Sequence, residues 1–189
     1  MSLFHSDAFL AFRSRDFSLL SVNQLCLILA IMIQEVVIAY SVYQLTQNPL
    51  SLGMIALIEL LPFICLSLIS GDWADRYNRQ KIVQWSFSCS TLIPLLFIVL
   101  FSQYQQQHIQ QNTLLCGIYS LIFCLGILRG IYSPSFNSLR PFLTPESVYS
   151  NAATWTALIW QIGGILAPLC AGLLLGQLGL EKTLFIVFF

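Results

Sequence analysis

Three formally charged side chains lie inside long apolar stretches of the sequence: Glu35, Glu59 and Arg129. A charge at the centre of a bilayer costs about 3 kcal/mol even on insertion scales, so such a residue normally faces a helix-bundle interior or an aqueous cavity. A carboxylate there can bind and release a proton, and a guanidinium can hold an anionic group or pair with a carboxylate. We therefore predict proton or substrate roles for these residues, with a static ion pair that locks helices together as the alternative.

Gln24 extends this set along one helix face. Gln24 and Glu35 are separated by about three helical turns, so they share a face with Ile28 and Ile31. A polar stripe on an otherwise apolar helix predicts a cavity-lining face. Glu59 lies about 18 Å, at 1.5 Å per residue, from the charged end of its own apolar stretch, which puts it near the middle of a bilayer.

The composition restricts the class of protein. Hydrophobic residues make up 57% of the chain, charged residues 8%, and the formal net charge is zero, whereas a soluble domain carries roughly 25% charged residues. The lipid bilayer is therefore the expected surrounding of most of the chain, and nucleic acid is not an expected partner. We expect no cofactor and no metal site. A membrane-embedded enzyme is disfavoured because His5 and His108 fall outside every apolar stretch.

Five apolar stretches reach the length of about 20 residues that a membrane-spanning helix needs. They are Phe17–Gln44, Leu50–Ser70, Ile82–Gln103, Thr113–Asn137 and Val148–Gly176. A sixth begins near Leu180 and is still apolar at Phe189, where the sequence ends. The pattern predicts an all-α polytopic membrane protein with five complete transmembrane helices and the start of a sixth.

The distribution of lysine and arginine predicts the orientation. The N-terminus and every second loop after it carry six of these residues, and the opposite loops carry only Lys182. Because positive charge accumulates on the cytoplasmic side, we predict that residues 1–16 form a cytoplasmic N-terminal segment.

The segment Gly71–Lys81 joins the second and third stretches and holds five charged residues. It resembles the loop motif G-x-x-x-D-R-x-G-R-[KR] of the major facilitator superfamily (MFS). The matching residues are Gly71, Asp75, Arg76 and Arg79. Asn78 replaces the second glycine, and asparagine is the non-glycine residue that best tolerates a positive φ. The resemblance implies that this is a gating loop that latches to the other half of a transporter.

The fifth stretch is rich in small residues. Gly163, Gly164, Pro168 and Gly172 stand at a spacing that lets another helix approach closely, and Pro168 permits a bend or hinge. These residues also resemble the antiporter motif of the same superfamily. Arg129 is similar to the superfamily's arginine in the fourth helix, which is tied to proton coupling.

The resemblance implies that residues 17–189 are the N-terminal transmembrane half-bundle of an MFS transporter, in the multidrug and siderophore exporter-like branch of drug:H⁺ antiporters. It implies multi-pass location in the bacterial inner membrane, and efflux of a small amphipathic drug, siderophore or lipid-like molecule by alternating access. The implied partners are protons, that substrate, and a second six-helix half from the same full-length chain or another copy. A truncated, transport-inactive half-transporter or a membrane interaction subunit is the alternative.

Overall fold

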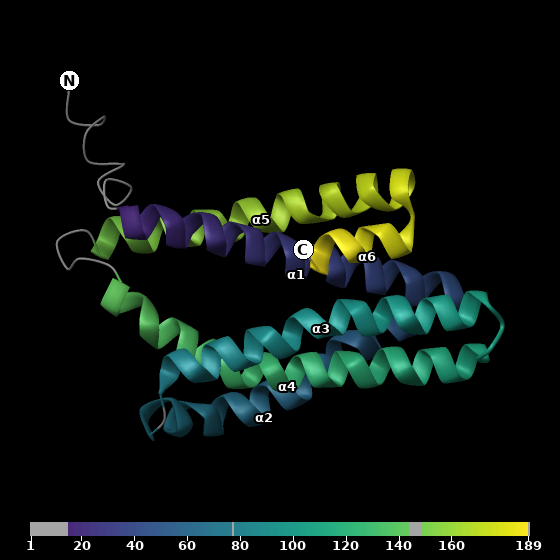
Figure 1. The fold of residues 1–189 in the computed structure, drawn as a ribbon, viewed down its shortest axis with the longest axis horizontal. Coiled ribbons are helices and arrows are strands. Elements are labelled where there is room, and N and C mark those ends of the chain that lie inside the picture. The colour runs from purple at the N-terminus through teal and green to yellow at the C-terminus, as the bar shows by residue number, and fades with distance from the viewer. Residues whose placement is uncertain (1–14, 77, 144–148, 189) are drawn as a thin grey trace.

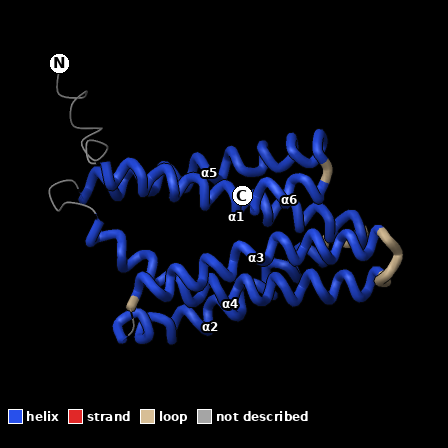
Figure 2. The backbone as a smooth tube through the Cα atoms, in the orientation of Figure 1, coloured by secondary structure: helices blue, strands red, loops and turns tan. Residues whose placement is uncertain are grey.

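A computed structural model describes residues 15–76, 78–143 and 149–188, and all regular structure in these ranges is α-helical (Figure 2). The helices are α1 (Arg15–Thr46), α2 (Leu50–Arg76), α3 (Arg79–Gln105), α4 (Gln111–Leu143), α5 (Tyr149–Leu178) and α6 (Leu180–Phe188). The first five are long and apolar enough to cross a membrane. The prediction of five complete spans followed by the start of a sixth is confirmed.

Most of the charged segment Gly71–Lys81, expected as a short loop between the second and third stretches, is helical. Helix α2 continues as far as Arg76 and α3 already begins at Arg79, so only two residues separate the two helices. Asn78 has a φ of −66°, and its side chain caps α3 by accepting hydrogen bonds from the amides of Gln80 and Lys81. Asn78 therefore does not adopt the positive φ for which its tolerance was considered; it forms the N-terminal cap of α3, a position that asparagine favours.

The helices form two groups of three (Figure 1). Helices α1, α5 and α6 form one group and α2, α3 and α4 form the other, with contacts of α3 with α6 and of α1 with α2 joining them. The groups diverge toward the end of the molecule where α1 begins and α2 turns into α3 (Figure 1). The buried apolar core lies toward the opposite end and includes Val37, Val42, Phe97, Leu114 and Ile118.

Helices α2 and α4 pack with their backbones almost in contact. A Cβ atom on Gly126 would lie 2.3 Å from the carbonyl oxygen of Glu59, and one on Gly130 would lie 3.0 Å from that of Phe63. Ser70 Oγ also donates a hydrogen bond to the Gly130 carbonyl oxygen at 2.6 Å. Small residues four apart permit this close approach of two membrane helices, so α2 and α4 form one tightly packed pair.

The small residues of α5 divide between two faces. Gly163 lies against α1, where an added Cβ would meet Ile28 Cγ2 at 2.4 Å, and Ala167 and Ala171 are fully buried on the same side. On the other face, an added Cβ on Gly164 or Gly172 would meet nothing within 4 Å, and Pro168 is exposed. One face of α5 therefore packs within the described bundle and the other is open.

Candidate functional site

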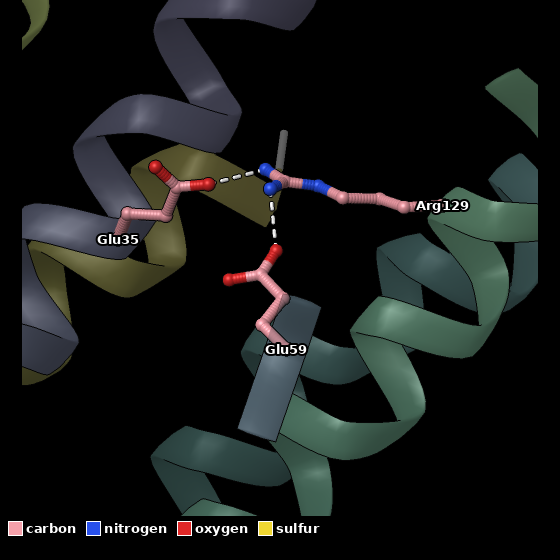
Figure 3. Close-up of polar contacts among 3 residues, drawn as sticks. All are labelled: Glu35, Glu59 and Arg129. Atoms are coloured by element: carbon pink, nitrogen blue, oxygen red, sulfur yellow. Dashed lines mark hydrogen bonds and ion pairs between the residues drawn. The ribbon is translucent and has the colours of Figure 1, made fainter. Parts of the chain in front are cut away.

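The three intramembrane charges meet in one place (Figure 3). Arg129 extends from α4 and donates from Nη1 to Glu59 of α2 and from Nη2 to Glu35 of α1. Each carboxylate also forms an ion pair with the guanidinium. We call Glu35, Glu59 and Arg129 the charged triad. It draws side chains from both helix groups, and it carries one more negative than positive group when both carboxylates are ionised.

The triad contributes to the walls of two cavities that share part of their lining. The first has a volume of about 420 Å³ and reaches Gln24 of α1 and Trp160 of α5. The second has a volume of about 540 Å³ and extends among α1, α3 and the end of α6. Glu35 and Arg129 line both cavities, whereas Glu59 lines only the second. A molecule or a water chain in either cavity can therefore reach the Glu35–Arg129 pair.

Gln24 lies in the wall of the first cavity, on the same α1 face as Glu35. Its side chain is 3% exposed, and neither its amide nitrogen nor its amide oxygen has a hydrogen-bond partner among the described residues. A buried amide without partners is costly. Gln24 thus supplies a donor and an acceptor that the described bundle does not use.

An aromatic pair completes the wall beside Arg129. Tyr132 follows Arg129 by about one turn of α4, and its ring centroid lies 4.9 Å from that of Phe87 on α3. Both side chains line both cavities. Neither Tyr132 nor Phe87 was predicted from the sequence as a site residue. The one available signal was the spacing of Tyr132 after Arg129, which places both on one helix face.

Comparison with known proteins gives the affiliation of the chain. Residues 20–189 match the family described as the Major Facilitator Superfamily. The chain belongs to this superfamily. The prediction of an MFS membrane protein is confirmed, and an enzyme class is excluded by the same match.

Curated relatives in the superfamily are distant. The chain is 26% identical over 136 residues to the uncharacterized MFS-type transporter YkuC of Bacillus subtilis, covering 70% of this chain and 29% of that protein. It is 26% identical over 128 residues to the staphyloferrin A transporter of Staphylococcus aureus, covering 68% and 31%. A third relative is the uncharacterized MFS-type transporter YfiS of Bacillus subtilis, at 23% over 150 residues, covering 79% and 33%. No solved structure matches the chain.

The chain thus spans about a third of the length of these relatives. Gln24, the triad and the α5 glycines all fall within residues 20–189, the region that matches the superfamily. The structure describes only part of the predicted gating loop. Gly71 lies within α2, whereas the side chains of Asp75, Arg76 and Arg79 lie outside the described residues, and their gating role stays a prediction.

The chemistry that this arrangement supports is proton and ion binding. Two carboxylates compete for one guanidinium beside space large enough for a small molecule. Among the described residues, no group of three histidine, cysteine, aspartate or glutamate side chains could hold a metal ion. Binding of a proton or of a cation by a carboxylate would neutralise the excess negative charge of the triad.

Proposed function

We propose that this chain forms the N-terminal six-helix half of a proton-coupled MFS exporter. The observation that carries the proposal is the charged triad, in which Glu35 and Glu59 share Arg129 beside two cavities in the membrane-spanning region. Intramembrane ionisable groups that face a cavity are characteristic of proton relays and substrate pathways. A structural ion pair alone would not need adjoining cavities of this size.

The proposed mechanism is alternating access, with the two helix bundles of a complete transporter moving about a site at the membrane midplane. Protonation of one carboxylate removes the excess negative charge and changes the relative stability of the two states. A proton that moves down a membrane potential of about 100 mV releases about 2.3 kcal/mol. This energy shifts a two-state equilibrium by a factor of roughly 50.

The lining of the first cavity favours a small amphipathic substrate. Leu27, Ile31 and Phe63 supply apolar contacts, Trp160 supplies an aromatic surface, and Glu35 supplies a charge. A drug, a siderophore or a lipid-like compound fits this description. The relative named as a staphyloferrin A transporter supports the inclusion of siderophores in the test panel.

The proposed setting is the bacterial inner membrane with the N-terminus in the cytoplasm. This orientation rests on the lysine and arginine distribution in the loops. The proposed partner is a second six-helix half from the same full-length chain or another copy, and the open face of α5 around Gly164 and Gly172 leaves room for it.

The test is a transport assay on the native-length protein in inside-out membrane vesicles. A proton gradient is imposed, and the release of protons is followed while ethidium, a siderophore or a lysolipid is added. We expect at least one compound to trigger proton release that Arg129→Ala abolishes. Wild-type behaviour of both Glu59→Gln and Arg129→Ala would contradict proton coupling through the triad. Absence of transport together with a native protein of only 21.3 kDa would favour the transport-inactive alternative.

A further inference from the structure

The first cavity has a second polar end, which lies about 16 Å along α1 from Glu35 at 1.5 Å per residue. Gln24 of α1 and Trp160 of α5 both line the cavity there. We propose that these two side chains form a subsite for a planar aromatic amide, in which Trp160 receives the ring and Gln24 binds the amide. This subsite rests on the proposed export of a small amphipathic molecule, and it specifies the chemistry of one end of that molecule.

The first observation is the unsatisfied amide of Gln24. This residue is 3% exposed, and its amide nitrogen and oxygen have no hydrogen-bond partner among the described residues. An unpaired buried polar group costs more than a typical hydrogen bond gains. Gln24 stands in the cavity wall, so a change of side-chain rotamer brings its amide to a ligand there. A ligand with both a donor and an acceptor recovers the cost of burial, whereas an apolar ligand does not.

The second observation is the position of Trp160 relative to Gln24. Helices α1 and α5 begin at the same end of the molecule and pack side by side (Figure 1). Ile28 of α1 lies against Gly163 of α5. Gln24 precedes Ile28 by about one turn, and Trp160 precedes Gly163 by about one turn. The amide and the indole therefore flank the same end of the cavity.

The third observation is the uncovered surface of Trp160. This residue is 51% exposed although it lines a cavity inside the predicted membrane-spanning region. An indole face attracts planar π systems by offset stacking, and such stacking tolerates many different rings. A flat aromatic ring is therefore the group that this part of the wall fits best.

The glutamine amide determines which polar group the ring should carry. A carboxamide has a donor and an acceptor in one plane, so its complement is a group with an acceptor and a donor side by side, as in the binding of adenine by glutamine. Primary amides, lactams and aminopyridines have such an edge. Between Gln24 and Glu35, the cavity is lined on α1 by Leu27, Ile28, Ile31 and Met32. The body of the molecule next to the amide should therefore be apolar.

The competing occupant is a buried water. Ser21 precedes Gln24 by about one turn of α1, is 4% exposed, and its hydroxyl also has no partner among the described residues. One water bound between the two side chains would satisfy both of them. Such a water would make no difference between an amide ligand and an apolar ligand of the same shape, so matched ligands distinguish the two occupants.

The test is equilibrium dialysis of three naphthalenes against the native-length protein in lipid nanodiscs, with empty nanodiscs as the blank. The compounds are naphthamide, acetylnaphthalene, which keeps only the acceptor, and isopropenylnaphthalene, which has neither group, all substituted at the same ring position. We expect the wild type to bind naphthamide about tenfold more tightly than isopropenylnaphthalene, as two neutral hydrogen bonds would give, with acetylnaphthalene between them. Equal binding of the three compounds would overturn the subsite.

Variants assign the preference to the two residues. Gln24→Leu should lose the tenfold preference for naphthamide and keep its affinity for isopropenylnaphthalene. Trp160→Leu should weaken the binding of all three compounds about tenfold without changing their order. Gln161→Leu is the matched control, because Gln161 is exposed and lines neither cavity; it should bind like the wild type. A full preference in Gln24→Leu would mean that Gln24 binds water alone, and would overturn the subsite.

Thermal melting of the same variants checks whether Gln24 is free to bind a ligand. Gln24→Leu should melt at or above the wild-type temperature, because leucine of similar size replaces an unpaired buried amide. A fall of several degrees would show that a protein group of the complete chain pairs with Gln24, and would overturn the subsite.

Transport measurements separate this proposal from the proposed function. Gradient-driven export of ethidium by a wild type without the amide preference would overturn the subsite and leave the exporter proposal standing. A wild type that shows the preference and exports neither naphthamide nor ethidium, a siderophore or a lysolipid would overturn the exporter proposal alone.

Discussion

Helix α4 presents two faces that differ in how they are held. Toward α2, the contact is backbone against backbone at Gly126 and Gly130, with a hydrogen bond from Ser70. Toward α1, the contact within the membrane-spanning region includes the long Arg129 side chain that reaches across to Glu35, and both residues line two cavities. One arginine on α4 can therefore stand at a backbone-to-backbone helix contact and also bind, through its side chain, a residue of the other helix group.

The largest effect is expected from replacing Arg129, which binds a carboxylate on α1 and another on α2. Arg129→Ala leaves Glu35 and Glu59 close together without a counter-ion, and breaking a buried pair by removing one partner costs about 3 kcal/mol. We expect a marked loss of thermal stability in detergent and complete loss of transport. Arg129→Lys is the matched control. Lysine keeps the charge but lacks the guanidinium fork, so most of the stability should return and the transport should not.

The second largest effect is expected on the face of α4 that packs against α2. Gly126→Ala places a Cβ within 2.3 Å of the Glu59 carbonyl oxygen, and because that neighbour is backbone, the two helices must move apart. Overpacking of this kind costs about 1–3 kcal/mol, and the shift should also reduce transport by displacing Glu59. Thermal unfolding checks the stability. Gly53→Ala on α2 is the control, since nothing lies within 4 Å of its added Cβ; equal melting temperatures for the two variants would contradict backbone contact of α2 with α4.

A smaller effect is expected at the hydrogen bond that ties the same two helices. Ser70→Ala removes the 2.6 Å bond to the Gly130 carbonyl oxygen, and interhelical hydrogen bonds in membranes contribute about 0.6 kcal/mol on average. The control is Ser67→Ala, because Ser67 donates only to Ile64 within its own helix. Denaturant unfolding should place Ser70→Ala below Ser67→Ala. The reverse order would show that this bond does not hold the pair together.

The smallest effect is expected where α1 meets α4 away from the triad. Gln111 Nε2 at the start of α4 donates to the Leu45 carbonyl oxygen near the end of α1 at 2.5 Å, in an exposed position. Exposed substitutions usually change stability by less than about 0.5 kcal/mol, so Gln111→Ala should unfold like the wild type and transport normally. A loss comparable to that of Gly126→Ala would mean that α1 is held to α4 far more firmly than the triad suggests.

The sequence was sufficient to predict the spans and the three charged residues of the site. Apolar length is a direct requirement of the bilayer, and a charge inside such a stretch is visible because lipid penalises it strongly. The turn at Asn78 was less predictable. The α2 helix continues to Arg76 because backbone hydrogen bonds form as well beside polar side chains as beside apolar ones, so composition does not mark its end.

The pairing of the helices was not predictable from composition. Lipid is as apolar as the bundle interior, so no hydrophobic face shows which side of a membrane helix is buried. The spacing of Gly126 and Gly130 was a signal for close packing on α4, but nothing in it indicated that α2 would be the partner. The α5 glycines gave a similar signal, and only Gly163 among those predicted is in close contact with another described helix.

The order of the helices along the chain also constrains biosynthesis. The triad joins residues that are 94 positions apart, from Glu35 to Arg129, and α1 finds its main partner only in α5. At about 5–20 residues per second, roughly 5–20 s of translation separate the two ends of the ion pair. During that interval the Glu35 carboxylate has no Arg129 to pair with, so the ion pair forms only after this part of α4 has been made. The ion pair therefore forms late in the synthesis of the chain, and a nascent chain that ends before Arg129 cannot form it.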